Sequence, residues 1–158
     1  MKARFAMALV CLMLGSAVAA FGQTKGTGLE LPGVELPKGA AISVVVNSLT
    51  EAAIKAGLND NSVQARVELQ LRRNGINVQK ESDGFISVSI NVVGSAFWIQ
   101  TKFHRIVTYE VNGQEFHTCA ATYDKGIIGT FGSDSEFIMQ SVLNHIDILS
   151  NEILKAAQ

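Results

Sequence analysis

The sequence predicts an α+β fold, a two-layer α/β sandwich with a mainly antiparallel sheet of about five strands and two helices on one face. Two observations lead to this prediction. Segments in which apolar and polar residues alternate, as in half-buried strands, fill the second half of the chain. One amphipathic helical pattern precedes them and another follows them. The expected element order is β-α-β-β-β-β-α.

Residues 41–49, AISVVVNSL, are short and β-branched, which is typical of a buried strand. A short helix or loop then ends near Gly57. The next segment, 60–74, has two interpretations, because its residues also alternate and it ends in Asn74-Gly75, a common hairpin turn.

A helix over 60–74 is favoured by several features together. The segment is rich in Ala, Glu, Gln, Leu and Arg, which are good helix formers. Asn59 or Asp60 can cap its start, and Gly75 suits the left-handed position after its end. Glu68 and Arg72 form an i,i+4 pair. Helical spacing also aligns three apolar residues on one stripe: Val63, Val67 and Leu71.

Four strands are expected next, at 76–81, 85–93, 97–111 and 114–124. Ser82-Asp83-Gly84 should form a hairpin turn between the first two, and Asn112-Gly113 one between the last two. A final helix should open at Ser133, which with Glu136 fits a capping box. Its apolar seam consists of Ile138, Val142, Ile146, Leu149 and Ile153.

The first residues have the pattern of a secretory signal peptide, with Lys2 and Arg4 before an apolar run and Ala17-Val18-Ala19 as a cleavage site. We therefore expect a signal peptide at 1–22, a flexible N-terminal arm at 23–40, and a single α+β domain at 41–158. The apolar run is too short to span a bilayer. These features predict an exported protein, periplasmic or secreted, without a transmembrane span after cleavage.

Charge and cysteine content narrow the classes of partner. Of 13 basic residues, two lie in the leader, and the remaining 11 against 14 acidic residues give a net charge of −3. Such a chain has no basic excess to attract nucleic acid. Cys119 is the one cysteine after the leader, so no intramolecular disulfide is expected, and burial of its thiol is favoured over a bridge between chains.

The runs VQARVELQLRRNGINV, ISVSINVV and ATYDKGIIGT resemble a family of uncharacterised exported bacterial proteins. This resemblance covers most of the chain after the leader and implies no known activity. The expected element order is also similar to the amino-terminal α/β domain of the translocation protein TolB. That similarity implies an envelope domain that binds other proteins.

The sequence offers no catalytic cluster and no motif for a metal or cofactor, so an enzyme is not expected. Pairing around Asn112-Gly113 places His104 opposite Ala121 and His117 opposite Thr108. The two histidines are then about 13 Å apart along the strands, too far to share a metal.

The same pairing predicts a candidate partner surface on the polar face of the sheet, because that face carries more apolar side chains than solvation requires. Its members are Trp98, His104, Ile106, Cys119 and Tyr123. The alternative is that the N-terminal arm covers these side chains or that their exposure is incidental. A weaker candidate is an anion-binding loop before the last helix, with Gly126, Gly129, Gly132 and Ser133.

The expected function is that of an exported, non-enzymatic domain that binds a protein partner in the bacterial envelope. The alternative is a carrier for a small apolar ligand or lipid, with a pocket between the helices and the sheet.

Overall fold

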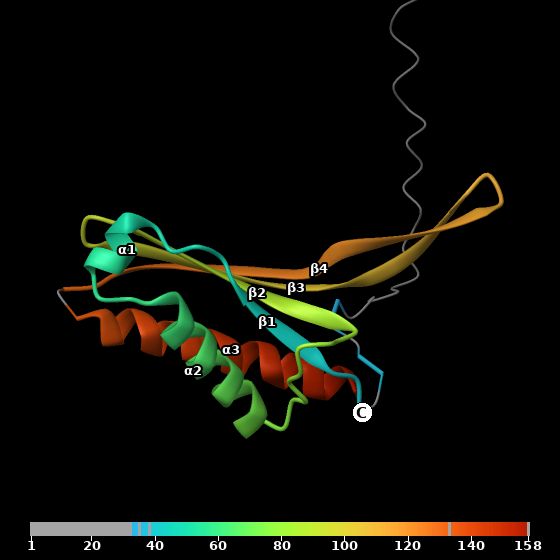
Figure 1. Ribbon diagram of the computed structural model, residues 1–158, viewed down its shortest axis with the longest axis horizontal. Helices are drawn as coiled ribbons and strands as arrows, with labels where there is room; N and C mark the ends of the chain where they lie inside the picture. The colour runs from blue at the N-terminus through green and yellow to red at the C-terminus, as the bar shows by residue number, and fades with distance from the viewer. Residues whose placement is uncertain (1–32, 35, 38, 133, 158) are drawn as a thin grey trace, which may run out of the picture. The chain divides into compact units, whose positions relative to one another are not determined.

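In the part of the chain that the structure describes, one four-stranded sheet and three helices form an α+β fold, which confirms the prediction (Figure 1). The structure, a computed structural model, describes residues 33–34, 36–37, 39–132 and 134–157. Within these residues, no helix is both long and apolar enough to cross a membrane. The elements are β1 (Ile42–Val46), α1 (Glu51–Lys55), α2 (Asp60–Arg73), β2 (Gly84–Val93), β3 (Ala96–Val111), β4 (Gln114–Thr130) and α3 (Ser135–Ala156).

The strands lie in the order β1-β2-β3-β4, with β1 parallel to β2 and the other pairs antiparallel. The sheet has four strands rather than five, because the expected strand at 76–81 makes only a parallel bridge between Val78 and Ile42. The predicted hairpin at Ser82-Asp83-Gly84 is therefore wrong. Asp83 instead joins the start of β1, since Ala41 N–H donates to its carboxylate and its own N–H donates to Ala41 O.

Helix α2 is the segment that could also have been a hairpin, and the helical prediction is confirmed. Asn59 caps it by accepting the N–H of Ser62, and Gly75 has φ +85°, the left-handed conformation that ends a helix. Arg72 Nη2 lies 3.0 Å from Glu68 Oε2, so the expected i,i+4 ion pair forms. The predicted apolar stripe, made of Val63, Val67 and Leu71, is buried.

Helix α3 begins with Asp134 as its N-cap, whose carboxylate accepts the N–H of Glu136. The predicted capping box with Ser133 is not the cap seen, and Ser133 itself lies outside the described residues. The predicted seam is buried in full: Ile138, Val142, Ile146, Leu149 and Ile153.

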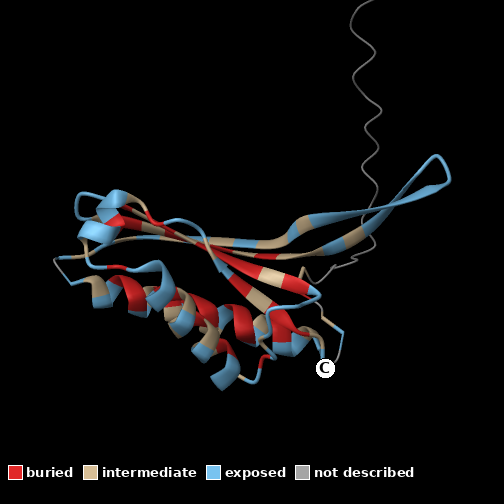
Figure 2. Ribbon diagram, in the orientation of Figure 1, coloured by how far each residue is buried: buried red, intermediate tan, exposed pale blue. Residues whose placement is uncertain are grey.

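Both long helices cover the same face of the sheet, and their buried residues face it (Figure 2). The helices are also tied to each other. Asp147 of α3 accepts hydrogen bonds from Gln70 and Asn74, at 2.6 and 2.7 Å. Val34 belongs to the core, so the packed unit begins before residue 41, and the part of the expected arm that is described is not free of the domain.

Two leucines on α2 allow a test of this packing. Replacing Leu71, which is fully buried, with alanine should lower the free energy of unfolding by about 2–5 kcal/mol, because it leaves a cavity against the sheet. Replacing the exposed Leu69 with alanine should change it by no more than about 0.5 kcal/mol. Urea unfolding measures both, and equal losses would contradict the assignment of the buried face.

Candidate functional site

A β-bulge divides the long β3–β4 hairpin into two parts. From the turn to His104 the pairing is the predicted one, with His104 opposite Ala121 and Ile106 opposite Cys119. At the bulge the register shifts, and Phe103 pairs with Tyr123. Because one extra residue on β4 reverses the side-chain alternation, Tyr123 faces the helices rather than the polar face. The predicted surface therefore loses Tyr123.

The outer face of the sheet holds Trp98 and His104, both half-buried. A Cβ added to Gly126 would lie only 3.1 Å from Trp98 Nε1, so the indole ring lies against this glycine. His104 stacks on Phe85 with ring centroids 4.4 Å apart, and its Nε2 is 3.0 Å from Ser87 Oγ. Both side chains have contacts within the domain and are partly exposed.

The most exposed apolar surface lies on the end of the hairpin beyond the bulge. We call residues 106–120 the projecting hairpin. Arg105 is the last β3 residue that pairs with β2, so from Ile106 onward the two strands pair only with each other. They continue past the helices, and nearly all of this segment is exposed on both strands (Figure 2).

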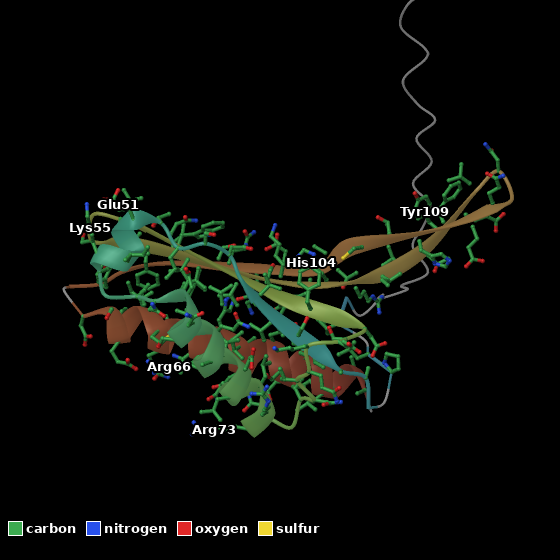
Figure 3. The ribbon with its side chains drawn as sticks, in the orientation of Figure 1. Glu51, Lys55, Arg66, Arg73, His104 and Tyr109 are labelled. Carbon is green, nitrogen blue, oxygen red and sulfur yellow. The ribbon has the colours of Figure 1, made fainter. Side chains whose placement is uncertain are left out.

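The two faces of the projecting hairpin differ in charge. The core-side face is the one whose side chains point to the same side of the sheet as the buried Phe103. No helix of the described residues covers it (Figure 1). Within 106–120 this face carries no charged residue, and Arg105, which pairs with Ala120, adjoins it at the base of the hairpin. Its members are Val107, Tyr109, Val111, Gln114, Phe116, Thr118 and Ala120. Tyr109 and Phe116 are paired across the strands and stack with ring centroids 5.5 Å apart, yet they are 48% and 40% exposed. Figure 3 labels Tyr109 on the projecting hairpin. This pair forms the centre of the exposed apolar face.

The opposite face of the projecting hairpin holds the two remaining predicted residues, Ile106 and Cys119, which pair directly. Ile106 is 67% exposed, and the Cys119 thiol is exposed too, so the expected burial of this cysteine is wrong. Glu110 and Glu115 also pair directly on this face. Of the five residues predicted to form one surface, the hairpin thus brings together Ile106 and Cys119, while Trp98 and His104 lie on the main sheet.

The glycines predicted to form an anion loop do not form one. Gly126 and Gly129 lie within β4, where Gly126 gives room to Trp98. A Cβ on Gly129 would come within 2.5 Å of the Phe97 ring, so this glycine serves core packing. Gly132 follows the strand, and Ser133 lies outside the described residues. At the start of α3, the N–H group of Glu136 donates to the Asp134 carboxylate, which supplies a negative charge at this helix end.

Two ionisable side chains lie on the helical face of the sheet, His145 buried and Tyr123 partly buried. His145 is 2% exposed, with Nδ1 3.2 Å from Thr101 Oγ1 and no partner for Nε2 among the described residues. Burial, with a smaller effect from Lys125, lowers its pKa. Burial and then the charge of Glu152 raise the pKa of Tyr123 to about 12, so both groups are neutral near pH 7. In the described part of the chain, no three His, Cys, Asp or Glu side chains gather as metal ligands.

No family model matches the chain, and no curated protein matches it. Among solved structures, the chain is similar to PelC from Paraburkholderia phytofirmans, described as a dodecamer. The match has 14% sequence identity and a TM-score of 0.49, and it covers 73% of this chain and 90% of PelC. It is a distant likeness of fold.

The projecting hairpin was not predicted as a unit, although its signal is present in the sequence. The expected strand 97–111 is much longer than its expected neighbour 85–93. Paired strands of unequal length leave the excess residues unpaired on that edge, so the excess must extend beyond the sheet.

The buried His145 predicts a pH dependence of stability. An unfolded histidine has a pKa of about 6.5, and the folded one is lower. As the pH falls below about 6.5, the unfolded chain takes up the proton first, so the free energy of unfolding should fall. His145→Gln should make this fall shallower in urea unfolding. His104, whose pKa is also lowered chiefly by burial, acts in the same direction, so His104→Gln gives the comparison. An unchanged slope in the His145 variant would contradict this assignment.

Proposed function

We propose that this chain is an exported, non-enzymatic interaction domain of the bacterial envelope and that the projecting hairpin is its contact element. The observation that carries the proposal is the uncharged core-side face, which exposes a stacked Tyr109–Phe116 pair beyond the helical layer. Aromatic side chains are enriched at the centres of protein interfaces, where they supply much of the binding energy. The leader pattern in the sequence supports the envelope as the site of action.

The strand pairing of the hairpin supports the same proposal. A two-stranded hairpin is at best marginally stable in water on its own, and here neither side is flanked by a further strand after Ile106. Glu110 and Glu115 also sit directly opposite each other, and like charges in this position destabilise the pair. His117 lies 3.5 Å from Glu115 and offsets this only when protonated. A partner that covers the hairpin would stabilise it.

The alternative, a carrier for a small apolar ligand, has a different observation in its favour. The predicted pocket between the helices and the sheet does not support the carrier, because buried side chains occupy that space. A surface groove of about 430 Å³ lies instead where α3 ends, and the described residues that line it are uncharged. Native mass spectrometry of the protein from its host should show a bare mass if the chain is an interaction domain. A lipid-sized adduct would favour the carrier.

Cross-linking in the envelope of the host tests the interaction proposal. Tyr109→Lys with Phe116→Glu replaces the aromatic pair by a cross-strand pair of opposite charge, which keeps the strands paired but makes the face polar. Cross-linked products identified by mass spectrometry should fall at least tenfold. The control Ile54→Lys alters a residue on α1 that is 55% exposed and should leave the yield unchanged.

A third variant separates the projecting hairpin from the outer face of the main sheet. Ile128→Lys changes a residue of β4 that is 81% exposed and pairs with Trp98. If the projecting hairpin is the contact element, this variant keeps its cross-links. Loss in Ile128→Lys with retention in the hairpin variant would contradict the proposal and return the contact to the sheet face.

A further inference from the structure

Strand β4 forms one edge of the sheet, and part of its backbone has no hydrogen-bond partner (Figure 1). Phe131 N–H donates to Ser95 O, so the backbone groups of the odd-numbered residues 123–131 point toward β3. The backbone groups of four even-numbered residues therefore point away from the sheet: Asp124, Gly126, Ile128 and Thr130. No hydrogen bond to these groups is found among the described residues. They form a row of donors and acceptors that another strand can pair with.

This unpaired stretch has a defined boundary at each end. At one end the chain passes beside β4 at Gly33, whose carbonyl accepts a hydrogen bond from Thr122 Oγ1. A Cβ on Gly33 would collide with the Thr122 carbonyl, so the two segments are in close contact. At the other end, β4 stops at Thr130. We call residues 124–130 the open edge.

The open edge lacks the features that usually prevent strand pairing. Proteins commonly interrupt an exposed edge with proline, with a charged side chain or with a bulge. The open edge reads DKGIIGT, without proline and with both of its charged residues at one end. Near its centre, Ile128 is 81% exposed. An uncharged, exposed edge of this kind favours pairing with another strand.

We propose that the open edges of two copies of the chain pair antiparallel about a two-fold axis at Ile127, which joins their sheets into one. Two-fold symmetry is the commonest in protein dimers, and it brings the same surface of both copies together. In this register, Asp124 pairs with Thr130 of the second copy, and Gly126 pairs with Ile128. Each pair occurs twice and exchanges two hydrogen bonds, so every outward backbone group of the open edge is used.

The neighbouring registers pair fewer of these groups. An axis at Gly126 would bring Thr130 of one copy opposite Thr122 of the other, where the segment at Gly33 already lies. An axis at Ile128 would leave Asp124 opposite a position beyond the end of β4. The axis at Ile127 alone keeps both strands within the open edge along their whole length.

The side chains on the outer face also fit this register. Ile128 of one copy lies opposite Gly126 of the other, which has no side chain. The indole ring of Trp98 lies against this same glycine, with Nε1 3.1 Å from the position of an added Cβ. Pairing therefore covers the most exposed isoleucine of the main sheet with an aromatic ring, and it does so twice because of the symmetry.

No like charges oppose each other in the proposed pairing. Asp124 lies opposite Thr130, whose hydroxyl can donate to the carboxylate, and it also keeps its own ion pair with Lys102 at 3.3 Å. On the helical face, Lys125 lies opposite Gly129. An edge that carried opposed charges would resist its own copy, so the charge pattern permits self-pairing.

Sedimentation velocity of the full chain, purified as its host produces it, tests the dimer. The wild type should shift from monomer to dimer as its concentration rises. Ile128→Pro removes an N–H that points away from β3, so the sheet is kept but the edge is blocked. It should raise the dissociation constant by roughly tenfold or more, since it removes pairing at both ends of the symmetric contact. Circular dichroism and urea unfolding confirm that the variant is folded.

Ile128→Thr is the matched control, because it keeps the backbone N–H and suits a strand. It should still form the dimer. Equal loss in Ile128→Thr and Ile128→Pro would assign the contact to the side chain and overturn backbone pairing. A wild type that stays monomeric at every concentration, as expected if the edge instead receives a strand of a different protein, would also overturn the proposal.

Disulfide formation tests the register in a Cys119→Ser background. Ile127→Cys lies on the axis, where the two Cα atoms of a non-hydrogen-bonded pair are about 4.5 Å apart, within reach of a disulfide. Lys125→Cys lies four residues from its own copy, about 13 Å, and should not link. Equal linking of these two variants would overturn the register. Asp124→Cys mixed with Thr130→Cys repeats the test at exposed positions, and should link only as the mixture.

The dimer contact is separate from the projecting hairpin, so the two proposals can fail independently. The double variant Tyr109→Lys, Phe116→Glu leaves the open edge intact and should dimerise as the wild type does. In the envelope, cross-links to a second copy should depend on the backbone at Ile128. Cross-links to a different protein should depend on the aromatic pair, and mass spectrometry distinguishes the two products.

Discussion

The burial of β3 against the helical layer is the constraint on which the rest of the structure depends. Phe103 and Ile99 are fully buried, so the phase of side-chain alternation along β3 is fixed by the core. Because β3 runs on without interruption, the same phase directs Val107, Tyr109 and Val111 toward the core side after the helices have ended. The hairpin thus carries the apolar face of a core strand into solvent as a consequence of strand length.

The bulge near Thr122 separates the packed part of the hairpin from the exposed part. Bulges increase the local twist of a strand pair, which re-aims the strands beyond them. On the packed side, Tyr123 and Lys125 lie on the helical face beside Thr101 and His145. The chain preceding the domain is fixed here as well, since Thr122 Oγ1 donates a hydrogen bond to Gly33 O and Val34 is buried in the core. Any side chain larger than glycine at position 33 would collide with the carbonyl of Thr122.

Much of the fold could be predicted from the sequence, because the relevant signals are local. The helical nature of 60–73 follows from composition, capping and spacing, and the turn at Asn112-Gly113 follows from two residues that both adopt positive φ. What failed depended on contacts between distant residues. Val78 bridges to Ile42, and Asp83 bonds to Ala41, so β2 lies parallel to β1 instead of pairing with 76–81. No local pattern in 76–84 specifies that choice.

In the candidate site, too, the predictions that rested on nearby residues are confirmed and one that depended on a distant irregularity is wrong. Counting back from the two-residue turn at Asn112-Gly113 was enough to predict that Ile106 pairs with Cys119, because the turn is close to both residues. The same counting misplaced Tyr123, because it assumes an unbroken register and the bulge adds one residue, which moves the side chain to the other face.

The stacking of Tyr109 on Phe116 bears on both the stability of the hairpin and its exposed surface. A cross-strand aromatic pair stabilises the hairpin by roughly 0.2–1 kcal/mol, and it remains exposed only because the helical layer is shorter than the strands. The residues that hold the free hairpin together are therefore the same residues that a partner would bury, so the hairpin can be ordered before it binds and loses less conformational entropy on binding.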